Sequence, residues 1–192
     1  MSESNPRGAF YIQSVPPENA EGKLAEIYGR IADARSGVAN IFSVEGMNHR
    51  ALEAHFDLYH AVMFRPSPLS RIHREMAAVA VSRANDCHYG LVHHGGFLRK
   101  LAEDDGWVAR FTKNPTGETR SPLEAALVAY ALKLTYDPSS VGREDVQALR
   151  DAGLDDRGVL DLALVVSYFN FVIRLAEGLG VPLEPPEERE RG

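Results

Sequence analysis

Apolar residues recur at intervals of three or four along most of the chain, which is the spacing of one face of an α-helix. Proline and glycine lie mainly between these periodic blocks, where they end helices. Ser70 precedes one block and is a suitable N-cap for it. In the first half of the chain the pattern predicts four helices, over residues 17–34, 49–63, 70–84 and, from Asp86 or Cys87, to 101.

The second half of the chain contains the clearest helix start. Ser121-Pro122-Leu123-Glu124 offers an N-cap serine, a proline at the first helical position and a glutamate that can reach back to the cap. It predicts a helix that ends near Thr135. The preceding residues 103–120, rich in Gly, Pro, Thr and Asn, predict an irregular surface crossover. A short helix over 143–152 is expected to end at Gly153.

A long apolar segment predicts the last helix, over residues 160–179, after a cap at Asp155. Its apolar face is too wide for a solvated surface helix, which places it in the core or at a subunit interface. The charged, proline-rich residues 182–192 predict a loose tail. As a whole, the pattern predicts an all-α fold of about seven or eight helices. We expect a single domain over 1–192, with an ordered core over residues 10–183 and a polar N-terminus.

Length and composition favour one globular domain. Of 192 residues, 44% are hydrophobic and 25% charged, which makes disordered, collagen-like and membrane classes poor fits. The net charge of −6 argues against a surface that binds nucleic acid or anionic lipid. Residues 1–8 lack the layout of a signal peptide, and no apolar run approaches the ~20 residues of a membrane helix. We therefore expect a cytoplasmic protein.

Cys87 is the one cysteine in the sequence, which excludes a disulfide within one chain and any site built from several thiolates. If Asp86 caps the helix that follows, Cys87 lies in its first turn, where unpaired amides and the helix dipole favour a thiolate. His94 lies seven residues on, nearly two turns, and therefore on the same face. Gly90 lies between them and is expected to leave space beside the sulfur.

Glu75 lies on the preceding helix, which turns back after Ala84 and can bring the carboxylate to the same face. Thiol, imidazole and carboxylate would then converge, as activation of a nucleophile by an adjacent base requires. The same residues allow plainer interpretations. A lone cysteine such as Cys87 is more often a small buried apolar residue than a nucleophile, and Glu75 is compatible with a salt bridge to Arg71 on its own helix.

The histidines give little indication of a metal site. His88 and His93 are five residues apart and point to different faces of a helix, so a cluster with His94 is disfavoured. A second group, at spacings of six and five, indicates no shared site: His49, His55 and His60. We expect neither a metal nor a cofactor.

The spacing from Glu75 to Cys87 to His94, twelve and then seven residues, resembles that of the alkyl hydroperoxidase D-like (AhpD-like) family. This is the carboxymuconolactone decarboxylase-like superfamily, and the chain is most similar to its peroxidase-related branch. The resemblance implies an AhpD-like helical bundle. It extends over residues 10–183, through segments that include Asn40-Ile41-Phe42, Ser82-Arg-Ala-Asn85-Asp-Cys87-His-Tyr89 and Tyr168-Phe169-Asn170-Phe171.

Peroxidases of this family use a Glu, a Cys-x-x-Cys pair and a His as proton relay and redox centre. The second cysteine attacks the hydroperoxide and the first closes a disulfide. The resemblance gives Glu75 and His94 the relay roles and matches Cys87 with the first cysteine. Gly90 stands in place of the second cysteine, and Tyr89 where some members have another His. A two-cysteine cycle therefore cannot run within one site.

Two catalytic routes remain. The leading one is a thiol-dependent hydroperoxide reductase of antioxidant type, in which Cys87 forms a sulfenic acid that an external thiol reduces. In this route His94 is the base or imidazolium partner, and Glu75 orients it. The alternative is a cofactor-independent lyase that uses Glu75 and His94, like the decarboxylase branch. A non-catalytic helical scaffold is the third class.

The leading route also implies the partners. They are a small-molecule hydroperoxide and a thiol reductant, with no nucleic acid and no membrane. The apolar last helix and the habit of the family imply a homo-oligomer, whether dimer, trimer or hexamer.

Overall fold

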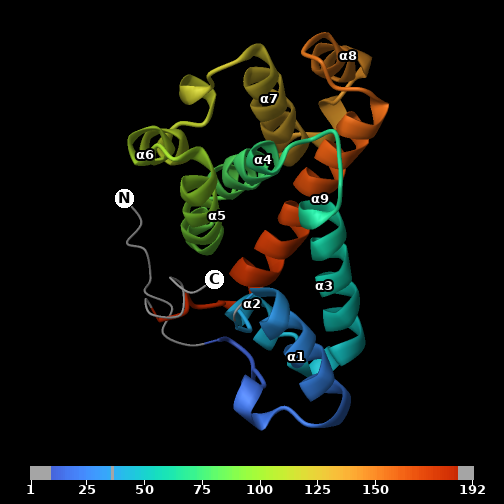
Figure 1. The fold of residues 1–192 in the computed structure, drawn as a ribbon, viewed down its shortest axis with the longest axis vertical. Helices are drawn as coiled ribbons and strands as arrows, with labels where there is room; N and C mark the ends of the chain where they lie inside the picture. Colours follow the sequence, from blue (N-terminus) through green and yellow to red (C-terminus); the bar gives the residue numbers. More distant parts are fainter. Residues whose placement is uncertain (1–9, 36, 186–192) are drawn as a thin grey trace. The chain divides into compact units, whose positions relative to one another are not determined.

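The computed structural model describes residues 10–35 and 37–185, and this part of the chain is helical with no strand. It contains nine α-helices and four short 3-10 helices (Figure 1). The all-α fold predicted from the apolar spacing is confirmed, with slightly more helices than expected. The predictions for the polar N-terminus, residues 1–9, and for 186–192 of the tail lie outside the described residues.

Most helix boundaries lie close to those predicted. The α-helices are α1 (Gly22–Arg35), α2 (Asn40–Ser43), α3 (His49–Phe64), α4 (Arg71–Ala84), α5 (His88–Ala102), α6 (Asp105–Lys113), α7 (Pro122–Tyr136), α8 (Arg143–Asp151) and α9 (Asp156–Leu179). The 3-10 helices are Pro17–Asn19, Gly46–Asn48, Thr116–Glu118 and Pro138–Ser140.

Side-chain caps fix three helix starts as the sequence predicts, and the third is Asp155, whose Oδ1 accepts from the amide of Gly158 at the start of α9 (2.7 Å). The Ser70 hydroxyl accepts a hydrogen bond from the amide of His73 at the start of α4 (3.4 Å). The Ser121 hydroxyl accepts from the amide of Glu124 at the start of α7 (3.2 Å). Glu124 also reaches back, although to the amide of Arg120 (2.6 Å), one residue before the cap.

The crossover predicted over residues 103–120 is not irregular, because it contains α6. Asp104 caps this helix by accepting a hydrogen bond from the amide of Trp107 (2.9 Å). Trp107, Val108 and Phe111 are buried along one face. The prediction was wrong because composition dominated it, whereas one cap and three apolar residues at helical spacing are enough for a short helix.

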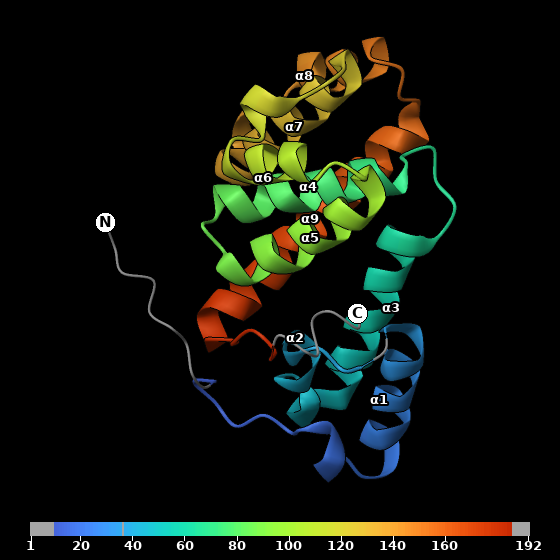
Figure 2. The same ribbon diagram turned by 60° about the vertical axis from the view of Figure 1, so that its left-hand side comes forward.

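The chain divides into two compact units. The first contains the described residues up to His60 and from Arg174 onward, and the second contains Ala61–Ile173. Within the second unit, α4 packs against α5 and α7, and α5 packs against α6 (Figures 1 and 2). The organisation as a single domain stays a prediction.

In the first unit, the segment that follows α9 is bound rather than loose. Glu184 is buried, and its Oε1 accepts a hydrogen bond from the amide of Asn40, the first residue of α2 (2.6 Å). The Asn40 side chain donates to the carbonyl of Pro182 (3.1 Å). The cap residue Ala39 has no side-chain acceptor, so Glu184 satisfies this helix amide from far along the chain. The expectation of a loose tail is therefore wrong for residues 182–185.

α9 is long and apolar enough to cross a membrane, with a mean hydropathy of 1.8 over its best 18-residue window. This corrects the expectation that no segment reaches such a length. A core helix of a globular protein meets the same criterion, and 44% of the window is buried within the protein. The buried side chains of α9 in the second unit include Leu162, Val165, Val166 and Phe169.

Candidate functional site

Glu75 lies in the middle of α4, and its side chain is fully buried (0% exposed). Its Oε2 lies 2.7 Å from Nδ1 of His94 on α5. Its Oε1 accepts two hydrogen bonds from Arg71, one from Nε (3.0 Å) and one from Nη2 (2.6 Å). The structure thus joins Glu75 both to the histidine of the catalytic interpretation and to the arginine of the plainer one.

The surroundings of Glu75 determine its charge. Burial by itself would raise the pKa of Glu75. The charges and hydrogen bonds of His94 and Arg71 outweigh burial and hold this pKa below its ordinary value of 4.5. Glu75 is therefore an anion at neutral pH and can only accept hydrogen bonds. The proton between Glu75 and His94 then belongs to Nδ1, and Nε2 is the nitrogen that can exchange a proton during a reaction.

The ring of His94 is also held from α9. Phe169 meets it edge-on, with ring centroids 4.4 Å apart and an interplanar angle of 72°. Phe97, on the helix of His94, lies 6.0 Å away by the same measure. Because Glu75 fixes one ring nitrogen and Phe169 the ring plane, the orientation of His94 is set by α4 and α9 together.

Cys87 is itself the N-cap of α5, so the prediction of Asp86 as the cap is wrong by one residue. Asp86 adopts a left-handed conformation (φ 50°), which aspartate tolerates better than most residues. The amide of Cys87 then donates to the carbonyl of Ser82 (3.0 Å). The amide of Gly90 donates to Sγ of Cys87 (3.5 Å). Cys87 is buried, with 1% of the residue exposed to solvent. Its sulfur therefore accepts a hydrogen bond at the N-terminus of α5, which is the positive end of the helix dipole.

The space expected beside Gly90 is filled by Ser82. A β-carbon on Gly90 would lie 2.4 Å from Oγ and 3.1 Å from Cβ of Ser82, both too close. Ser82 is fully buried, and its hydroxyl donates to the carbonyl of Ala78 (2.7 Å). The same β-carbon would lie 3.7 Å from Sγ of Cys87. Glycine at this position therefore permits the close approach of α4 and α5.

The turn between α4 and α5 is held by polar side chains to which, Asp86 apart, the sequence gave no individual role. Asn85 donates to the carbonyl of Val81 (2.9 Å) and to the side-chain oxygen of Asn170 on α9 (3.4 Å). Arg83 forms an ion pair with Asp86. Arg71 had a local signal, its spacing of four from Glu75, whereas Asn170 and Phe169 act through contacts that no local pattern shows.

Among the described residues, no three His, Cys, Asp or Glu side chains are grouped as a metal site requires. His55, to which the sequence gave no role, is buried and forms a second pair with a partly buried glutamate. Its Nδ1 lies 2.5 Å from Oε1 of Glu45 in the first unit, and its ring lies 5.1 Å from that of Phe42.

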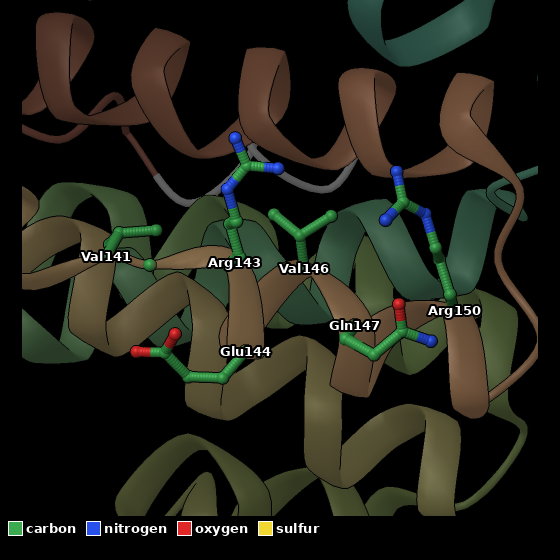
Figure 3. A pocket seen from close by; sticks show the side chains of 7 residues that line it. Val141, Arg143, Glu144, Val146, Gln147 and Arg150 are labelled. Carbon is green, nitrogen blue, oxygen red and sulfur yellow. The ribbon is translucent and has the colours of Figure 1, made fainter.

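A groove of about 810 Å³ lies along α8, and none of the candidate residues lines it. Figure 3 shows Arg143, Val146 and Arg150 on one side of the helix and Glu144 on the other. Arg150 is paired with Asp156 (2.7 Å).

Comparison with known proteins agrees with the resemblance seen in the sequence. Residues 50–132, which contain Glu75, Cys87 and His94, match the model of the carboxymuconolactone decarboxylase family. This match and the similarity to solved structures support the AhpD-like, carboxymuconolactone decarboxylase superfamily. No curated protein matches the sequence significantly.

Solved structures show the same AhpD-like fold. A peroxidase-related protein from Silicibacter sp. TM1040 is 25% identical, with a TM-score of 0.85 and 99% of each chain covered. An alkylhydroperoxidase AhpD core, a peroxidase-related protein from Ralstonia eutropha JMP134, is 24% identical, with a TM-score of 0.84 and 94% of each chain covered. The debrominase Bmp8, solved as a cysteine-to-alanine variant in complex with 2,3,4-tribromopyrrole, is 14% identical, with a TM-score of 0.76 and 95% of this chain and 97% of that chain covered.

Proposed function

We propose that the protein is a thiol-dependent hydroperoxide reductase with one redox cysteine, Cys87. The observation that supports this most is the place of the sulfur. It lies at the N-terminus of α5, accepts a hydrogen bond from the Gly90 amide, and shares its helix with a histidine already bound to a carboxylate. Such an environment favours a thiolate, which is the nucleophilic form.

In the proposed reaction, the Cys87 thiolate attacks the terminal oxygen of the hydroperoxide. The S–O bond forms as the O–O bond breaks, which gives a sulfenic acid and an alkoxide. His94, having taken the thiol proton on Nε2, returns it to the alkoxide, which leaves as an alcohol. Glu75 touches neither sulfur nor substrate in this scheme; it keeps Nδ1 of His94 protonated and the ring in place.

An external thiol completes the cycle. Its sulfur attacks the sulfenic acid, forming a mixed disulfide and releasing water, and a second external thiol regenerates Cys87. One hydroperoxide and two thiols thus give an alcohol, water and a disulfide. Gly90 and Ser82 leave no second sulfur beside Cys87, which is why the reductant has to come from outside. The small exposed fraction of Cys87, 1%, favours small hydroperoxides over bulky ones.

The test measures peroxide consumption with dithiothreitol or glutathione, using hydrogen peroxide and tert-butyl hydroperoxide. Wild type should turn over, Cys87→Ser should not, and dimedone should label Cys87 in a single turnover without reductant. Glu45→Gln is a matched control, since it changes another glutamate that is paired with a histidine, outside the site. Activity that survives in Cys87→Ser would contradict the proposal, as would a wild-type protein that forms no sulfenic acid.

The second candidate is a cofactor-independent lyase that uses Glu75 and His94. The contact that favours it is their hydrogen bond, which does not involve the thiol. A carboxylated unsaturated lactone is the matching substrate class. Turnover of such a lactone that persists in Cys87→Ser and is lost in His94→Ala would support the lyase. A protein inactive in both assays would indicate a helical scaffold.

We also propose that the protein self-associates through a solvent-facing stripe of α9. Leu160, Leu164 and Phe171 are exposed on this helix, whose opposite side carries Phe169 against His94. Burial of such a stripe against a second copy removes apolar surface from water. Light scattering at micromolar concentration should show an oligomer, and a stable monomer would contradict this. The cytoplasmic location stays a prediction.

A further inference from the structure

Arg71 is the one cation that shares the buried carboxylate of Glu75 with His94 among the described residues. Both carboxylate oxygens are occupied, Oε2 by the histidine and Oε1 by two nitrogens of the guanidinium. A planar guanidinium that binds through two of its nitrogens fixes direction as well as charge. Glu75 is thus held between an always-charged group and a group that exchanges protons.

The position of Arg71 is itself tightly defined. It is the first residue of α4, four residues before Glu75 and directly after the Ser70 cap. Its guanidinium carbon lies 4.0 Å from the centre of the Phe64 ring, and its Nη1 donates to the carbonyl of Met63 (3.4 Å). The arginine side chain is 27% exposed, whereas that of Glu75 is completely buried. The positive charge therefore stays partly in water while its hydrogen bonds reach the interior.

The charge state of Glu75 decides which nitrogen of His94 carries the proton. A carboxylate accepts from Nδ1–H and leaves Nε2 unprotonated in the neutral imidazole. A protonated Glu75 would instead donate to Nδ1, and the neutral ring would then carry its proton on Nε2. In that tautomer Nε2 cannot accept a proton from a thiol or a substrate.

We propose that Arg71 is a positioning residue of the reaction: it holds Glu75 as an anion, so that His94 keeps its proton on Nδ1 and presents Nε2 as a base. This inference has two halves, a role in the reaction and an effect on the His94 tautomer. The role in the reaction rests on the proposed function, in which His94 moves a proton. The tautomer half concerns only the ground state of the protein. Measurements of the two halves therefore separate a failure of this inference from a failure of the proposed function.

The chain offers a matched control on α7. Arg120 lies four residues before Glu124 and binds it through Nη2 (3.1 Å). Its guanidinium carbon lies 3.6 Å from the centre of the Trp107 ring. Arrangement and spacing repeat those of Arg71, Glu75 and Phe64, but no histidine hydrogen-bonds to Glu124 among the described residues. Arg120→Met therefore removes a similar structural contact without touching His94.

The first measurement is the nitrogen-15 chemical shift of the His94 ring, assigned by comparison with His94→Ala. Neutral His94 in wild type should be protonated on Nδ1, and Arg71→Met should move the population toward protonation on Nε2. Arg71→Lys should restore most of the wild-type tautomer, and Arg120→Met should not change it. An Nε2–H tautomer in the wild type overturns the inference without any variant, as does an unchanged tautomer in a folded Arg71→Met.

The second measurement is the pH profile of sulfenic acid formation at Cys87. Arg71→Met should slow it by about 10²-fold near neutral pH and change the shape of its profile, because the base is lost. Arg71→Lys should recover most of the rate. Equal losses in Arg71→Met and Arg120→Met would mean that both arginines are only structural and would overturn the inference. A wild type that forms no sulfenic acid would refute the proposed function, and the tautomer would still test Arg71.

Discussion

Two glutamate–histidine pairs lie in the two units of the protein, and the distances alone do not distinguish them. Glu75 and His94 join α4 to α5, with 2.7 Å between Oε2 and Nδ1. Glu45 and His55 join the turn after α2 to α3, with 2.5 Å between Oε1 and Nδ1. All four side chains are almost closed to solvent.

The difference lies in what surrounds each pair. Glu75 also binds Arg71, and His94 shares α5 with Cys87. Glu45 has no arginine or lysine partner among the described residues. It lies near the Tyr28 hydroxyl, where burial, with a smaller contribution from the Glu45 charge, raises the pKa of Tyr28 to about 12. A carboxylate–imidazole contact is therefore not in itself a sign of catalysis. What sets the Glu75 pair apart in the structure is a second cation, Arg71, and a cysteine at the start of the helix that carries His94.

The largest expected effect is on activity. Glu75→Gln should lower the rate of sulfenic acid formation by about 10²-fold, because Gln cannot stabilise the protonated His94 that the reaction passes through. Glu45→Gln, the same change in the other pair, should leave the rate within about twofold, since that pair contacts no reacting group. Dimedone labelling over time measures both. Similar losses in the two variants would mean that the pairs do not differ in function.

For the free energy of unfolding, the larger effect is expected in the Glu45–His55 pair rather than in the Glu75–His94 pair. His55→Ala should lower the free energy of unfolding by about 1–3 kcal/mol, because it leaves the partly buried Glu45 carboxylate without its hydrogen-bond partner. His94→Ala should cost less, since Arg71 still binds Glu75. Urea unfolding followed by circular dichroism gives both values. A larger loss in His94→Ala would show that Arg71 does not compensate for the missing imidazole.

The sequence predicts the first of these pairs and not the second, for a physical reason. Glu75, Cys87 and His94 lie on two consecutive helices, whose reversal after Ala84 brings nearby positions together. Helical spacing was therefore enough to propose their convergence. The contact of His55 with Glu45 depends on the angle between a short 3-10 turn and α3, which periodicity does not define.

The fold was predicted well where local signals act and poorly where they do not. Ser70 and Ser121 fix their helices by hydrogen bonds within one turn, so their starts could be read directly. Ser82 fills the space beside Gly90 through a contact between two helices, which only the packed structure shows. The binding of Glu184 to the start of α2 joins residues 144 positions apart and has no local signal.

The third prediction concerns the packing of Gly90 against Ser82, beside the Cys87 thiol. Gly90→Cys should lower the free energy of unfolding by about 1–3 kcal/mol, because its β-carbon would overlap Ser82. Adding Ser82→Gly should recover part of that loss and allow a disulfide with Cys87. Urea unfolding and a thiol count check these outcomes. A stable Gly90→Cys with no loss would show that Ser82 rotates away freely.

The smallest expected effect is the pH dependence that Glu75 adds to stability. Its pKa is lowered in the folded protein from an ordinary value of 4.5, because His94 and Arg71 outweigh the opposing effect of burial. Below this value the unfolded chain takes up a proton at Glu75 before the native protein does. The contribution of Glu75 is therefore complete above pH 4.5 and is lost as the pH falls through the folded pKa.

The comparison of wild type with Glu75→Gln follows this contribution, because titrating groups that Glu75 does not contact are common to both proteins and cancel. His94, which Glu75 binds, does not cancel, so the comparison is confined to pH values below about 4.5, where an imidazole is ordinarily charged in both proteins. Within this acidic range the difference in unfolding free energy should shrink as the pH falls. Urea unfolding at a series of pH values measures it. A difference that grows on acidification would mean that the native protein takes up the proton first. Glu75 would then have a raised pKa, and the anion that His94 requires would not be present.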